Sequence, residues 1–161
     1  MRTKLPPETV IAVDFDGTCV TSEFPMVGRD IGAQTVLRRI VADGGKIVLW
    51  TMRSGQPLMD AVEWFKFNGI PLYGVNRNPT QDEWTNSPKC HAKLYIDDAA
   101  LGCPLLPGRE GERPHVNWAE VAKLLWPGLD LRNLLGRCTG GVFRTPRHSQ
   151  KLNRAKHWLF F

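Results

Sequence analysis

The segment Val10-Ile11-Ala12-Val13-Asp14-Phe15-Asp16-Gly17-Thr18 decides the fold of this chain of 161 residues. Residues 10–13 are apolar and rich in β-branched side chains, with Pro6-Pro7 before them and Gly17 after them. A short apolar run between turn-forming residues predicts a buried β-strand. Two carboxylates, Asp14 and Asp16, come directly after this run, so we expect them at the carboxyl end of the strand.

The rest of the chain alternates between helical and extended patterns. Apolar side chains at helical spacing predict a helix around residues 36–41 that ends at Gly44-Gly45, and a second around 58–65 that ends near Gly69. Apolar runs predict further strands at residues 46–50, 70–75 and 92–96, and a short edge strand within 101–106.

A last helix is predicted over residues 118–126. Asn117 can cap it, Glu120 completes a capping-box pattern, and Pro127 follows it. Strands that alternate with helices predict an α/β fold, a three-layer Rossmann-like sandwich with a mostly parallel central sheet. We assign this domain to residues 1–126. Residues 127–161 form a basic C-terminal extension with seven Lys or Arg residues and one acid, Asp130.

Polar residues stand where the predicted strands end. The first strand ends at Asp14, the second at Thr51 and the fourth at Asp97-Asp98, and Lys89 lies in the loop before the fourth strand. In open parallel sheets, ligands bind outside the carboxyl ends of the strands. The pattern therefore places these side chains around one candidate site.

This ordered set of motifs resembles the haloacid dehalogenase superfamily of phosphotransferases. The matching features are D-F-D-G-T after an apolar strand, a Thr that closes the second strand, a Lys, and D-D at the end of the fourth strand. The resemblance covers roughly residues 10–126 and implies a haloacid dehalogenase-like fold and a Mg²⁺-dependent phosphatase. Asp at position 16 goes with phosphatases and phosphomutases rather than with dehalogenases.

The resemblance also implies catalytic roles. Asp14 would attack phosphorus to form an aspartyl-phosphate, and Asp16 would act as general acid and then as base. Thr51 would donate a hydrogen bond to a phosphoryl oxygen, and Lys89 would neutralise developing charge. A carboxylate that attacks a dianionic phosphate needs such neutralisation, because the two reactants repel each other.

Metal and substrate ligands complete the expected site. Mg²⁺ prefers carboxylates, waters and phosphate oxygens. We expect the ion at Asp14, Asp97 and Asp98 and, by the resemblance, at the backbone carbonyl of Asp16. The residues expected to bind substrate flank the catalytic ones; they are Phe15, Gly17, Thr18, Met52, Arg53 and Arg77.

Several alternatives stay open at this point. Asp16 could be only a turn former before Gly17, and Thr51 could be only a helix cap. Lys93 competes with Lys89 as the motif lysine, although a side chain inside the strand points to a sheet face. The sequence does not rank Asp97 against Asp98 as the direct metal ligand.

The spacing of the motifs leaves no room for a folded cap domain. Asp14 and Thr51 are 37 positions apart, and Thr51 and Lys89 are 38 apart. We therefore expect an open site that acts on a phosphorylated small molecule or a nucleic-acid end. Arg77 could bind a second phosphate and Trp84 could stack on a base, although a solvated Arg and a packed Trp are the commoner outcomes.

Two other classes of protein compete with a phosphatase. One is a catalytically inactive nucleic-acid-binding or scaffolding protein on the same fold, and the other is a phosphoacceptor receiver, in which the motifs come in a different order. No apolar run suggests a membrane span or a secretory signal, so we expect a cytoplasmic protein. The apolar end of the extension, residues 157–161, suggests a possible homodimer contact.

Overall fold

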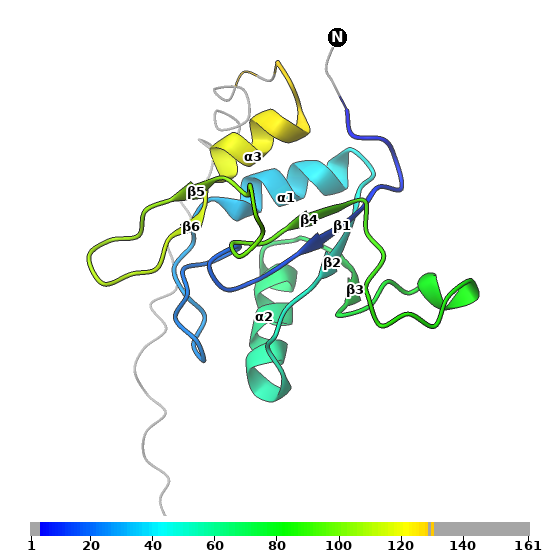
Figure 1. The fold of residues 1–161 in the computed structure, drawn as a ribbon, viewed down its shortest axis with the longest axis horizontal. Helices are drawn as coiled ribbons and strands as arrows, with labels where there is room; N and C mark the ends of the chain where they lie inside the picture. Colours follow the sequence, from blue (N-terminus) through cyan, green and yellow to red (C-terminus); the bar gives the residue numbers. More distant parts are fainter. Residues whose placement is uncertain (1–3, 129, 131–161) are drawn as a thin grey trace, which may run out of the picture.

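A parallel β-sheet between helices forms the centre of the molecule in a computed structural model, which describes residues 4–128 and residue 130 (Figure 1). The strands of the main sheet are β1 (Val10–Val13), β2 (Lys46–Leu49), β3 (Leu72–Val75) and β4 (Leu94–Ile96). The helices are α1 (Ala33–Ala42), α2 (Gly55–Phe67), the 3-10 helix η1 (Gln81–Glu83) and α3 (Trp118–Leu125). Among the described residues, no helix is long and apolar enough to cross a membrane.

The main sheet has the order β3-β2-β1-β4, and each neighbouring pair is parallel. β1 pairs with β2 from Val10↔Lys46 to Val13↔Leu49, and with β4 from Ile11↔Leu94 to Val13↔Ile96. Its three last residues are fully or almost fully buried, since helices cover both faces of the sheet. The predicted α/β class and mostly parallel sheet are confirmed.

Helices α1 and α3 lie on one face of the sheet and α2 lies on the other (Figure 1). Helices α1 and α3 pack together at their C-terminal ends. Asp43, the C-cap of α1, accepts a 2.8 Å hydrogen bond from Nε1 of the fully buried Trp126, the C-cap of α3. Gly44 follows with φ of +92°, in the left-handed region that glycine tolerates. At the start of α3, the Asn117 side chain accepts the Glu120 N–H, which confirms the predicted cap.

A short strand does form within residues 101–106, but the prediction that it is an edge strand of the main sheet is wrong. Only Leu105–Leu106 are extended, as β5, and they pair antiparallel with β6 (His115–Val116) in a separate hairpin. β4 is therefore an edge of the main sheet. The hairpin is still tied to the main body, because the Val116 N–H donates to the Gly17 carbonyl at 2.8 Å.

Candidate active site

The ends of β1, β2 and β4 meet at one edge of the sheet. The Asp14 N–H donates to the Ile96 carbonyl at 2.9 Å, and the Trp50 N–H donates to the Val13 carbonyl at 2.8 Å. These bonds place Asp14 beside Asp97 and Thr51, each one or two residues beyond its strand. The parallel register therefore brings three of the predicted site segments together.

Asp14, Asp97 and Asp98 form a cluster of three half-buried carboxylates. One oxygen from each side chain lies within 4.8 Å of the other two. Three carboxylates that converge in this way fit a hard divalent cation such as Mg²⁺, which completes its shell with water and phosphate oxygens. Asp97 and Asp98 both belong to the cluster, so the geometry does not separate them as ligands.

Burial and mutual repulsion shape the charge of this cluster. Burial, together with the smaller repulsion of the nearby carboxylates of Asp97, Asp98 and Asp16, raises the pKa of Asp14 to about 7. Burial also raises the pKa of Asp98, with the Asp97 carboxylate as the next cause. A bound cation offsets both effects, so this cluster favours a positively charged ligand.

Thr18 is fully buried and forms hydrogen bonds with two members of the carboxylate cluster. Its hydroxyl donates to Oδ2 of Asp14 at 3.3 Å and accepts the backbone N–H of Asp98 at 3.0 Å. Its carbonyl accepts Nε1 of Trp118, at the start of α3, at 2.7 Å. The Thr18 hydroxyl is therefore engaged as donor and as acceptor within the protein, and the role of Thr18 in substrate binding stays a prediction.

Phe15 also faces the protein interior. Its side chain is fully buried, and its ring lies 5.7 Å from the ring of Trp64 and 6.2 Å from that of Phe65 on α2. Its carbonyl accepts the N–H groups of Cys19 and Val20 in the turn that follows. The side chain is thus part of the core, and only the backbone of Phe15 is left as a candidate for substrate contact.

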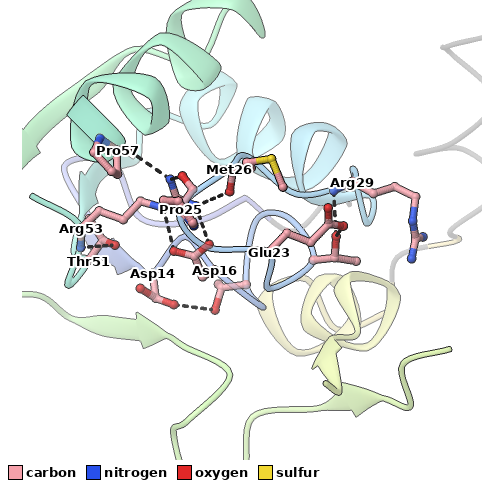
Figure 2. A network of polar contacts seen from close by, with 11 residues as sticks. Asp14, Asp16, Glu23, Pro25, Met26, Arg29, Thr51, Arg53 and Pro57 are labelled. Carbon is pink, nitrogen blue, oxygen red and sulfur yellow. Dashed lines mark hydrogen bonds and ion pairs between the residues drawn. The ribbon is translucent and has the colours of Figure 1, made fainter. Parts of the chain in front are cut away.

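Arg53, whose side chain is buried, and the partly buried Asp16 form an ion pair (Figure 2). Nε of Arg53 donates to one oxygen of Asp16 and Nη2 donates to the other, both at 2.7 Å. The remaining guanidinium hydrogens go to the carbonyls of Pro25, Met26 and Pro57, at 3.0, 2.7 and 3.3 Å. This corrects the prediction that Arg53 binds substrate, because its donors are committed to protein oxygens.

Thr51 and Met52 lie at the end of β2. Oγ1 of Thr51 accepts the backbone N–H of Arg53 at 3.2 Å, and the Thr51 N–H donates to Oδ1 of Asn76 at 2.8 Å. The N-cap of α2 is Ser54, so Thr51 is not the helix cap that the sequence left open. The Thr51 hydroxyl proton is not used by these two contacts, and Met52 is 98% exposed at the same edge.

Lys89 is exposed in the loop between β3 and β4. Among the described residues, no hydrogen bond or ion pair joins its ammonium group to the carboxylate cluster. Lys93 donates its backbone N–H to the Val10 carbonyl at 2.8 Å, at the amino end of β1 and thus away from Asp14. This position fits the preference for Lys89 over Lys93, which stays a prediction.

Gln81, which the sequence did not point to, organises the loop that carries Lys89. It is buried, its amide donates to the carbonyls of Ser87 and Lys89 at 2.7 and 2.8 Å, and it accepts the His91 N–H at 2.6 Å. Asn78 is buried too and donates to the His91 carbonyl at 2.8 Å. No local sequence signal marks these residues, because their partners lie up to 13 positions away.

Arg77 and Trp84 occupy the same loop. Arg77 forms an ion pair with Asp82, so its guanidinium already has an anionic partner within the loop. Trp84 is 63% exposed, and its ring meets the His91 ring edge-on at a centroid distance of 5.1 Å. Of the two, Trp84 keeps a face that a ligand can reach.

Comparisons with known proteins add a structural relative. No protein-family model matches the chain, and no curated protein matches it. A solved structure of a conserved protein from Bacteroides thetaiotaomicron is similar, with 29% sequence identity and a TM-score of 0.60, over 73% of this chain and 89% of that one. Fold and site together define a Rossmann-like α/β protein with a carboxylate cluster at the carboxyl edge of its sheet.

Proposed function

We propose that this protein is a Mg²⁺-dependent phosphomonoester hydrolase of the capless haloacid dehalogenase type, acting through an aspartyl-phosphate. The observation that carries the proposal is the convergence of Asp14, Asp97 and Asp98 within 4.8 Å at the carboxyl edge of the sheet. These three side chains and the Asp16 carbonyl would hold the ion. When bound, Mg²⁺ supplies charge neutralisation for the nucleophile and the phosphoryl group.

The first half-reaction transfers the phosphoryl group to the protein. A carboxylate oxygen of Asp14 forms a bond to phosphorus while the ester bond to the leaving oxygen breaks, and Asp16, which must enter this step in its protonated form, gives that oxygen a proton. Thr51 donates its hydroxyl proton to a phosphoryl oxygen. Lys89 balances the remaining negative charge; its exposed ammonium carries no ion pair among the described residues, which leaves it available.

The second half-reaction restores the protein. Water attacks phosphorus, the bond between phosphorus and Asp14 breaks, and Asp16 takes a proton from the water. Inorganic phosphate then leaves, and Asp14 is a carboxylate again. The two half-reactions together consume one phosphomonoester and one water and yield an alcohol and phosphate.

The short stretches between the motifs support the capless type. Between Asp14 and Thr51 the chain forms a loop, α1 and β2, and between Thr51 and Lys89 it forms α2, β3 and η1. Neither stretch of these described residues holds an inserted domain. We propose a nucleotide or nucleic-acid end phosphate as substrate, supported by the exposed ring of Trp84 in the loop between β3 and β4 and by the basic extension.

A panel of phosphomonoesters tests this function. p-Nitrophenyl phosphate, mononucleotides, sugar phosphates and oligonucleotides phosphorylated at the 3′ or 5′ end are assayed with Mg²⁺ and with EDTA. We expect Mg²⁺-dependent phosphate release that Asp14→Asn abolishes and that Asp60→Asn, on α2 outside the site, leaves intact. Equal release in EDTA, or by the Asp14→Asn protein, contradicts the proposal.

A further inference from the structure

The Arg53 guanidinium uses all of its donors on protein oxygens. Its five N–H groups make five hydrogen bonds: two to the Asp16 carboxylate and one each to the carbonyls of Pro25, Met26 and Pro57 (Figure 2). The Arg53 side chain is 1% exposed. A guanidinium with every donor engaged has one orientation, so its partner carboxylate has one orientation too.

Aromatic rings hold the guanidinium in place as well. The Cζ atom of Arg53 lies 4.9 Å from the ring centroid of the buried Phe15 and 5.4 Å from that of Phe24. Phe24 belongs to the loop that precedes α1 and is 64% exposed. Arg53 therefore ties together three segments of the site: the turn after β1, this loop and the start of α2.

Asp16 is left with one accessible side. Its side chain is 20% exposed, and both oxygens accept a hydrogen bond from Arg53. A carboxylate oxygen has two acceptor positions, so each keeps one for a further proton donor. A carboxylate held at both oxygens by a charged fork, with an acceptor position still open, has the geometry of a base that takes a proton from water.

We propose that Arg53 is a positioning residue that holds the Asp16 carboxylate for the attack of water on the aspartyl-phosphate. This inference rests on the proposed function and assigns Arg53 to its second half-reaction. Arg53 does not touch the substrate; it acts through Asp16. Lysine cannot replace it, because an ammonium group has three donors and no planar fork that matches both carboxylate oxygens.

Arg53→Lys separates the two half-reactions. With p-nitrophenyl phosphate, the leaving oxygen needs little protonation, so phosphorylation of Asp14 stays fast. The water step slows by about 30-fold, a part of what a positioned base contributes. We expect a rapid burst of p-nitrophenol close to one per protein molecule, a slow steady state, and phosphorylated Asp14 by mass spectrometry of acid-quenched samples.

Two further variants make the test specific. Arg29→Lys changes an exposed arginine that pairs with Glu112 on the neighbouring hairpin, and it should show wild-type kinetics. Asp16→Asn should show the same burst as Arg53→Lys. The double variant should then be no slower in the water step than Asp16→Asn alone, because the two changes act on one group.

The inference is overturned if Arg53→Lys slows both half-reactions equally and shows no burst. It is also overturned if the two substitutions slow the water step additively in the double variant. If Arg53→Lys fails to fold by circular dichroism, Phe24→Ala replaces it, since it removes a mostly exposed ring from the guanidinium; an unchanged water step then overturns the inference. A wild-type protein that hydrolyses no phosphomonoester with Mg²⁺ overturns the proposed function itself.

Discussion

Gly17 and Asp98 lie so close together that a side chain at position 17 has no space. A Cβ atom on Gly17 would lie 2.6 Å from Oδ2 and 2.8 Å from Cγ of Asp98. Gly17 also has φ of +74°, in the left-handed region. The D-x-D-G turn therefore needs glycine for two reasons, and one of them is the position of a carboxylate in the candidate metal cluster.

Gly17→Ala should displace the Asp98 carboxylate and weaken Mg²⁺ binding by about tenfold, as loss of a supporting contact at a metal site commonly does. The left-handed conformation should cost about 1 kcal/mol of stability in addition. Isothermal titration calorimetry with Mg²⁺ measures the first effect and urea unfolding the second.

Gly69→Ala is the matched control for this prediction. Gly69 has φ of +64° with nothing within 4 Å of the added Cβ, so it carries the same backbone strain without the clash. It should lose similar stability and keep Mg²⁺ affinity. Equal Mg²⁺ affinities for the two variants contradict the role assigned to Gly17.

Stability should depend on pH through Asp14. Its pKa rises from its ordinary value of 3.8 in an unfolded chain to about 7 in the folded protein, so its contribution to stability is complete below pH 3.8 and is lost as the pH rises from there through about 7. Between about pH 5.5 and about pH 8.5, this one group should cost the metal-free protein about 2 kcal/mol.

Asp14→Asn should remove that part of the pH dependence. Thermal unfolding in EDTA at the two pH values, for wild type and variant, gives the comparison. Mg²⁺ should stabilise the wild type more at the higher pH, where Asp14 is charged in the metal-free state. An identical pH dependence in both proteins rules out Asp14 as the source.

Thr18→Val should destabilise the protein although it keeps the shape of the side chain. It leaves the backbone N–H of Asp98 without its 3.0 Å partner at a partly buried position. An unsatisfied donor there costs about 1 kcal/mol, at the lower end of the range for buried groups. Thr18→Ser keeps the hydroxyl and should lose much less in urea unfolding; equal losses would place the effect in the methyl group instead.

Lys89→Met should lower kcat/KM for the preferred substrate by about 100-fold, the scale for losing one charge-stabilising group. Lys93→Met is the matched control, because the Lys93 backbone pairs with Val10 at the opposite end of β1 from Asp14. It should change kcat/KM by no more than about threefold. The reverse ranking identifies Lys93 as the motif lysine.

The extension and the dimer contact stay predictions. Of residues 127–161, only Pro127, Gly128 and Asp130 lie within the part of the chain that the structure describes. The apolar residues 157–161, on which the homodimer hypothesis depends, lie outside it. Size-exclusion chromatography of a chain truncated after Pro127 tests that hypothesis, which an unchanged oligomeric mass contradicts.

Local pattern predicted the elements of the main sheet well. β1, α1, β2, α2 and α3 lie within a few residues of their predicted positions. Apolar spacing, glycine stops and the Asn117 cap act over a few positions, so they can be read from the chain itself. The strand within 101–106 was mispaired, because its partner at residues 115–116 is too short to show a pattern.

The candidate site was predicted as a set of segments and only in part as a set of roles. The ends of three strands gave Asp14, Thr51 and Asp97-Asp98, because parallel strands bring their carboxyl ends to one edge. The roles of Thr18, Phe15 and Arg53 were not visible. Each depends on where a side chain points, and a turn after a strand has no fixed periodicity from which to infer this.

The D-F-D-G-T segment shows which features follow from the sequence and which follow only from the tertiary structure. Its sequence alone determined a buried strand, a tight turn and two carboxylates at a sheet edge, because these follow from local residue preferences. Only the tertiary structure decided that Asp14 joins Asp97 and Asp98 while Asp16 turns to Arg53. These partners are 37 or more positions away, and the packing of the whole sheet and its loops selects them.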